Sequence, residues 1–134
     1  MDLRELGLRP SFPVASIAFA QLVYASGVSG AGLTETATIK INGVVEQIEI
    51  EISTFTDGGQ SATVTIASAQ DATLFTEGSL GDAQTHLKQA LSKGGSTDAD
   101  FNPALVDGVL TLTGVLSSDP GVSGATIDVT VFYR

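Results

Sequence analysis

The feature that most constrains the fold is a long alternation of apolar and polar residues that changes phase once, at Asn42-Gly43. Before this dipeptide the apolar residues are at odd positions, such as Ile39, and after it they are at even positions, such as Ile48. A period of two places alternate side chains on opposite faces of a β-strand. Because Asn-Gly favours a type I′ turn, the pattern predicts a hairpin of two strands, 33–41 and 44–52.

A single helix is predicted after the hairpin. Ser79 and Asp82 have the spacing of a capping box, with Asp in place of the usual Glu, and Gly94-Gly95 is a stop signal. The residues between them form one apolar stripe at helical spacing: Leu80, Ala83, Leu87, Ala90 and Leu91. The sequence therefore predicts one helix whose stripe packs on the sheet.

Other strands are predicted at 14–24, 62–67, 109–113 and 126–133. The first of these has apolar residues on both faces, so it is either central in the domain or has one face against another subunit. No strand-helix-strand repetition indicates a parallel sheet. The fold class predicted is mainly β (α+β), an antiparallel β-sandwich or sheet of about six strands with one helix packed on it.

Residues 1–13 are predicted to be an extended arm, and residues 14–134 a single β-rich domain. Pro10 and Pro13 each lack an amide donor and disfavour a helical predecessor. Such a segment either binds a partner or is an ordinary frayed terminus.

Composition excludes several classes of function. The chain has 134 residues and no cysteine, which removes disulfide scaffolds and thiolate metal sites. Its 15 acidic and 6 basic residues give a formal net charge of −9, so direct nucleic-acid binding is not expected. No apolar stretch is long enough for a membrane span, and acids near the start argue against a secretion signal.

Candidate chemical groups are few, and each has a plainer interpretation. His86 is the only imidazole and follows Asp82 by four residues, but no nucleophile motif accompanies it. The set Asp98, Asp100 and Asn102 resembles the start of a calcium loop, yet Pro103 replaces its required glycine, which favours a solvated acidic loop. Glu49 and Glu51 share a strand face as solubilising charges. We therefore predict no enzyme activity, no catalytic residues, no metal and no cofactor.

Three segments together resemble a small module of flagellin-type proteins and of phage tail and virion proteins. They are Ile41-Asn42-Gly43-Val44, Ser79-Leu80-Gly81-Asp82 and the strand Val109-Leu110-Thr111-Leu112-Thr113-Gly114, with residues 121–127 similar to a Gly-rich turn of the phage versions. The long flanking helices of flagellins are lacking. The resemblance implies a virion structural protein, assembled in the host cytoplasm, of the capsid decoration (cement) type.

That resemblance implies partners as well. The partners expected are viral coat protein and sister subunits in a homo-oligomer such as a trimer, with no nucleic acid and no membrane. The residues expected to contact them are Leu3, Leu6, Leu8, Arg9, Phe12, Ile17, Phe19, Leu22 and Tyr24. The alternatives are a phage tail, neck or baseplate component and an extracellular glycan- or protein-binding module.

Overall fold

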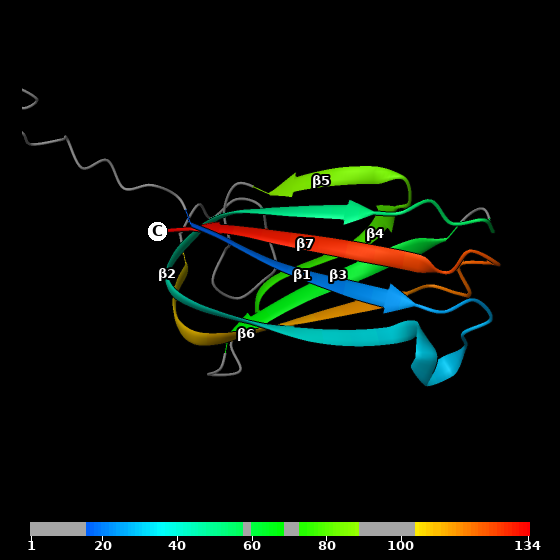
Figure 1. The fold of residues 1–134 in the computed structure, drawn as a ribbon, viewed down its shortest axis with the longest axis horizontal. Coiled ribbons are helices and arrows are strands. Elements are labelled where there is room, and N and C mark those ends of the chain that lie inside the picture. The colour runs from blue at the N-terminus through cyan, green and yellow to red at the C-terminus, as the bar shows by residue number, and fades with distance from the viewer. Residues whose placement is uncertain (1–15, 58–59, 69–72, 89–103) are drawn as a thin grey trace, which may run out of the picture.

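A computed structural model describes residues 16–57, 60–68, 73–88 and 104–134. Over these residues the chain forms seven β-strands and one short 3-10 helix (Figure 1). The elements are β1 (Ser16–Tyr24), η1 (Gly30–Leu33), β2 (Thr34–Ile52), β3 (Ser61–Ser68), β4 (Thr73–Gly81), β5 (Gln84–Lys88), β6 (Ala104–Leu116) and β7 (Ala125–Tyr133).

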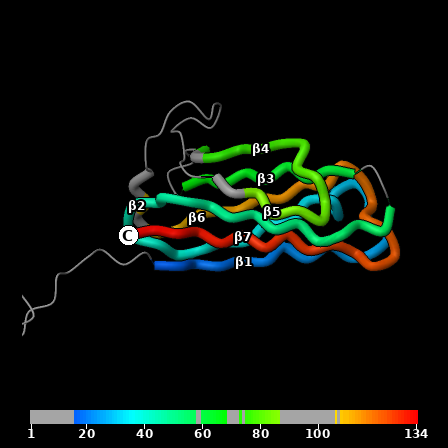
Figure 2. The backbone as a smooth tube through the Cα atoms, turned by 90° about the horizontal axis from the view of Figure 1, so that it is seen from above, coloured from blue at the N-terminus to red at the C-terminus, as the bar shows by residue number. Residues whose placement is uncertain are grey.

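All the strand pairs are antiparallel, and the strand order is β1-β7-β2-β6-β3-β4, with β5 also on β2. The first part of β2 pairs with β6, whereas its second part lies between β7 and β5. The sheet therefore curls, because β2 belongs to both of its halves. The strands follow the long axis of the molecule (Figure 2). The predicted mainly β, antiparallel fold is confirmed.

Both halves of the curled sheet bury their apolar faces in one core. Tyr24 on β1 crosses this core, and its hydroxyl donates a hydrogen bond of 2.5 Å to the carbonyl oxygen of Gly114 on β6. The aliphatic and aromatic residues of the core are Leu22, Tyr24, Ile39, Ile41, Val45, Ile48, Ile50, Ile52, Phe55, Ala62, Val64, Ile66, Phe75, Leu80, Val106, Leu110, Leu112, Leu116, Ala125, Ile127, Val129 and Val131.

The predicted hairpin at Asn42-Gly43 is wrong, because β2 continues through it as one strand of 19 residues. A type I′ turn needs positive φ at both central residues, and Asn42 is not among the described residues with positive φ. Instead, the Asn42 side chain accepts a hydrogen bond of 2.8 Å from the amide of Gly108. The phase change arises at a bulge between Val45 and Gln47, so Val45 rather than Val44 is buried.

The predicted helix is also wrong over its described part. Residues 73–81 form β4, residues 84–88 form β5, and Ser79 and Ala83 have φ values of 57° and 53° that break the helical path. Asp82 caps no helix, since its carboxylate accepts a hydrogen bond of 2.9 Å from the amide of Phe55. A tight turn thus connects β4, which pairs with β3, to β5, which pairs with β2. The rest of the predicted helix, residues 89–94, lies outside the described residues.

The other predicted strands are present with somewhat different bounds. The segment 62–67 is within β3, 109–113 is the middle of the longer β6, and 126–133 is within β7. The predicted inward residues of β3, Val64 and Ile66, are fully buried. The arm, residues 1–13, lies outside the described residues, and the division into arm and domain stays a prediction.

Candidate interaction surface

The outer face of β1 is the candidate functional site. Alternation divides this strand into an inner face, where Leu22 and Tyr24 are buried, and an outer face. The outer face carries the apolar strip, which we define as Ile17, Phe19 and Val23, with exposed fractions of 64%, 58% and 59%. Large side chains this exposed are unusual when they gather on one strand of a monomer, and they indicate a contact surface.

Strand pairing extends this face across β7 and the second part of β2. Ile17 lies opposite Phe132, whose neighbour on β2 is Gln47, and Phe19 lies opposite Thr130. Carboxylates follow on the same face. Glu49 is next to Thr130 and Glu51 is next to Asp128. The Asp128 carboxylate accepts a hydrogen bond of 2.8 Å from the side-chain nitrogen Nε2 of Gln21. These three acids, Glu49, Glu51 and Asp128, are called the acidic flank below.

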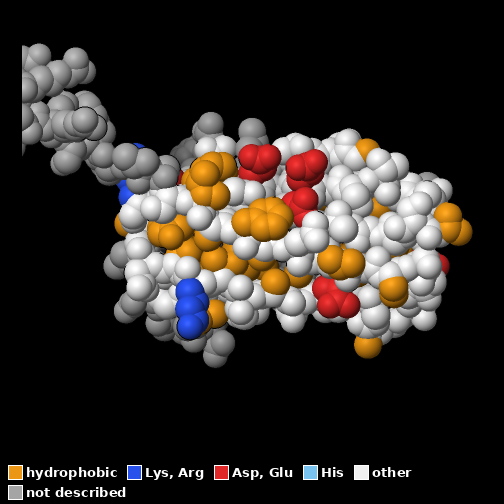
Figure 3. Space-filling view, viewed as in Figure 1, with side chains coloured by type: hydrophobic (Ala, Val, Ile, Leu, Met, Phe, Trp, Pro, Cys, Tyr) orange, Lys and Arg blue, Asp and Glu red, His pale blue; other side chains and the backbone are white. Residues whose placement is uncertain are grey.

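The space-filling view in Figure 3 shows this arrangement on one side of the molecule. Exposed hydrophobic side chains run along the middle of the face, and acidic side chains gather beside them. The strands β1 and β7 and residues 45–52 of β2 contain no Lys or Arg. These three strand segments therefore combine apolar area with negative charge, while Lys and Arg side chains lie elsewhere on the same side of the molecule.

The residues that the sequence assigned to partner contact separate into three groups. Ile17 and Phe19 are exposed on the apolar strip, whereas Leu22 and Tyr24 are each 2% exposed and belong to the core. The remaining residues lie outside the described part of the chain: Leu3, Leu6, Leu8, Arg9 and Phe12. Val23 shares the outer face with Ile17 but was not assigned to contact, although strand alternation places the two together.

Burial changes the acidity of Tyr24. Removal of its phenol from water raises the pKa of Tyr24, a backbone hydrogen bond at Glu35 lowers it and the Glu35 charge raises it, and together they give a pKa of about 12. A neutral phenol at ordinary pH keeps its proton for the bond to Gly114. Tyr24 is therefore a structural support behind the apolar strip.

The groups that the sequence considered for chemistry do not form a catalytic arrangement in the described residues. His86 is on β5, where its Nε2 lies 3.4 Å from the carbonyl oxygen of Gly81, and Asp82 is bonded to Phe55. No group of three or more His, Asp or Glu side chains in the described ranges could hold a metal. The acidic segment from Asp98 to Asn102 lies outside those ranges.

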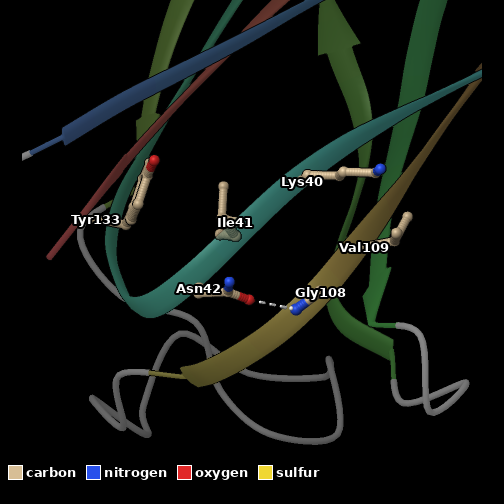
Figure 4. Close-up of a pocket in the computed structure, with 6 residues that line it drawn as sticks. All are labelled: Lys40, Ile41, Asn42, Gly108, Val109 and Tyr133. Carbon is tan, nitrogen blue, oxygen red and sulfur yellow. Dashed lines mark hydrogen bonds between the residues drawn. The ribbon is translucent and has the colours of Figure 1, made fainter.

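One open hollow of about 380 Å³ lies near the bend of β2 (Figure 4). It is lined by Lys40, Ile41, Asn42, Gly108, Val109 and Tyr133. The side-chain oxygen of Asn42 in this lining already accepts a hydrogen bond from the backbone amide of Gly108. Lys40 is then the one charged side chain in the lining, which points to no particular ligand. No helix among the described residues is long and apolar enough to cross a bilayer.

Comparison with known proteins finds likeness in fold alone. No protein-family model and no curated protein matches this chain. A chain of the cyanophage Pam1 capsid asymmetric unit is similar with a TM-score of 0.58 and 13% identity, over 96% of this chain and 94% of that one. The VP2 subviral particle of infectious bursal disease virus gives a TM-score of 0.41 and 16% identity over 36% of that chain. The Pam1 chain therefore shares this fold over nearly its whole length.

Proposed function

We propose that this chain is a non-enzymatic structural protein of a virion, and specifically a capsid decoration (cement) protein. It binds the outside of an assembled shell and stabilises the shell by bridging neighbouring coat subunits. It does so as a symmetric homo-oligomer such as a trimer, assembled with the virion in the host cytoplasm.

The observation that carries the proposal is the likeness to a chain of the Pam1 capsid asymmetric unit. Coverage is 96% of this chain and 94% of that chain, so the likeness extends over nearly all of both. A large coat protein that shared only one domain with this chain would be covered to a much smaller extent. The capsid chain that this protein resembles is therefore itself small, which supports a role as a small capsid component.

The physical character of the described residues supports the same proposal. A curled antiparallel sheet with one core is a rigid body, and its outer face carries the apolar strip beside the acidic flank. A rigid body with a defined contact surface can link neighbouring subunits without any chemistry. The net charge of −9 also keeps decorated particles from associating with one another.

The proposal is tested by mixing the purified full chain with empty shells of the coat protein encoded by the same viral genome. Decoration predicts that the chain sediments with the shells at a fixed ratio to coat subunits and raises the temperature at which the shells disassemble. Light scattering on the free chain gives its oligomeric state, and electron microscopy of the mixture shows where on the shell it binds.

Other outcomes of the same experiment would contradict decoration. Density at a single vertex, or a ring in solution, would assign the chain to the tail, neck or baseplate. A monomer that does not sediment with shells would favour an extracellular binding module instead.

A further inference from the structure

The apolar strip lies on an edge strand that lacks the usual protection against association. Among the described residues β1 pairs only with β7, in a register without a bulge. Natural edge strands usually carry a charge, a proline or a bulge, because an exposed regular edge invites other chains. The segment Ser16–Tyr24 has no charged residue, no proline and no glycine. An outer face of this kind is expected to be covered in the working state of the protein.

The acidic residues near the apolar strip determine which kind of surface can cover it. Asp128 is one strand away from β1, and Glu49 and Glu51 are two strands away. Since neighbouring strands are about 4.8 Å apart, the two glutamates lie about 10 Å from the strip. That separation is comparable to the screening length of about 8 Å at physiological salt, so these acids influence any surface docked on the strip.

A second copy of this chain is a poor occupant of the strip. Each copy has a net charge of −9, and no Lys or Arg occurs in β1, in β7 or in residues 45–52 of β2. Arg134, directly after β7, is exposed but already forms an ion pair with Glu46 of its own chain. Like charges placed across an interface disfavour association. A surface with apolar residues at its centre and Lys or Arg at its rim would satisfy both parts of this face.

We propose that the apolar strip and the acidic flank together dock on a different protein, at an apolar patch bordered by basic residues. This inference rests on the proposed function, in which that protein is the coat protein of the shell. The strip supplies the contact that holds the complex, and the acidic flank accelerates association and rejects a second copy of this chain. Self-association of the chain then uses another surface.

Two sets of substitutions separate these roles, and both change only side chains of the outer face. Ile17→Thr combined with Phe19→Thr removes most of the apolar strip but keeps residues suited to a strand. Its control is Val122→Thr, since Val122 is 87% exposed but lies in the turn before β7. Glu49→Gln combined with Glu51→Gln removes charge from the acidic flank, and its control is Asp57→Asn, an exposed acid outside the flank.

The measurement is the Kd of each full-length variant for the empty coat-protein shells, at NaCl concentrations from about 50 to 300 mM. The strip variant is expected to bind at least about tenfold more weakly at every salt concentration, while Val122→Thr binds like the parent. The Glu49→Gln, Glu51→Gln variant is expected to bind more weakly at low salt and to show a flatter salt dependence, while Asp57→Asn is unchanged. Melting curves and sedimentation of the free variants accompany the binding data.

The possible failures differ from one another. If the parent binds shells and the folded strip variant binds equally well, the docking surface is wrong while the proposed function stands. If the strip variant loses the oligomer of the free chain, a second copy covers the strip. If removal of the glutamates leaves the salt dependence unchanged, the basic rim is wrong. If the parent itself does not bind shells, the proposed function fails and this partner fails with it.

Discussion

Tyr24 shows at the scale of one residue how the two halves of the curled sheet are joined. Its ring is buried in the core, and its hydroxyl donates to the carbonyl oxygen of Gly114 on the opposite side. Gly114 leaves room for this contact, because a Cβ at that position would lie 2.6 Å from both the Tyr24 hydroxyl and Leu22 Cδ1. The pair therefore sets how closely β1 approaches β6.

The first prediction concerns this hydrogen bond. Tyr24→Phe keeps the ring but leaves the Gly114 carbonyl without its donor, so the free energy of unfolding should fall by about 1 to 3 kcal/mol. Chemical denaturation of the parent and the variant measures the difference. Equal stabilities would mean that the hydroxyl contributes nothing to the packing of the two halves.

A second prediction follows from the pKa of Tyr24. It is raised from 10.0 to about 12 in the folded chain, so the folded state holds the proton more tightly than the unfolded state. The stabilisation is complete below pH 10 and is lost as the pH rises from 10 to about 12. Over that interval the free energy of unfolding should fall more steeply for the parent than for Tyr24→Phe. Parallel curves would contradict the assignment.

At the scale of one element, β2 carries the curl of the sheet. Its bend requires close approach to the last residue of the sequence, since the amide of Val44 donates to the Arg134 carbonyl oxygen at 2.9 Å and the amide of Arg134 donates back at 3.0 Å. Arg134 also forms an ion pair with Glu46, the residue left out of register by the bulge. Gly43 permits this approach, because a Cβ there would lie 2.1 Å from the Arg134 oxygen.

The third prediction therefore concerns Gly43. Gly43→Ala must displace either the bend of β2 or Arg134, and we expect it to destabilise the fold by about 1 to 3 kcal/mol, measured by thermal or chemical unfolding. Gly78→Ala is the matched control, because it is also a strand glycine and its added Cβ would meet only Thr63 Oγ1 at 3.4 Å. Equal effects of the two substitutions would show that close approach at Gly43 is unimportant.

At the scale of the whole molecule, the protein is one rigid curled sheet with separate inner and outer surfaces. The inner surface is apolar on β1, β2, β3, β4, β6 and β7 and stabilises the fold. The outer surface of β1 is apolar without being needed for the core, which is why we propose that a partner covers it. Residues 1–13 precede this strand in the sequence, and their role in binding stays a prediction.

The fourth prediction tests that role. Deletion of residues 1–12 should abolish binding to empty shells while the melting temperature of the domain changes little, because these residues are predicted to form an arm separate from the β-rich domain. Binding to shells is measured by sedimentation and folding by circular dichroism. Full binding by the shortened chain would remove the arm from the docking mechanism and leave the outer face of β1 as the contact.

The sequence by itself determined that the chain is mainly β, and it identified the inward residues of several strands. Alternation at Val64 and Ile66, and again along residues 126–133, correctly identified buried faces, since the two-residue period of a strand follows from its local geometry. Composition likewise excluded disulfide scaffolds, through the absence of cysteine, and argued against nucleic-acid binding, through the excess of acidic residues. These properties depend on single residues or on near neighbours in the chain.

Only the tertiary structure decided which strands pair and which apolar face remains exposed. Asn42-Gly43 has the local character of a hairpin, yet pairing with β6 and the approach of Arg134 keep β2 continuous. Ser79 and Asp82 have the spacing of a helix cap, yet pairing with β3 and β2 makes strands there. Ile17 and Leu22 are equally apolar and lie on opposite faces of β1, but only the packing of the sheet buries the Leu22 face and leaves the Ile17 face exposed. Contacts between residues distant in sequence determine these outcomes, and local patterns contain no information about them.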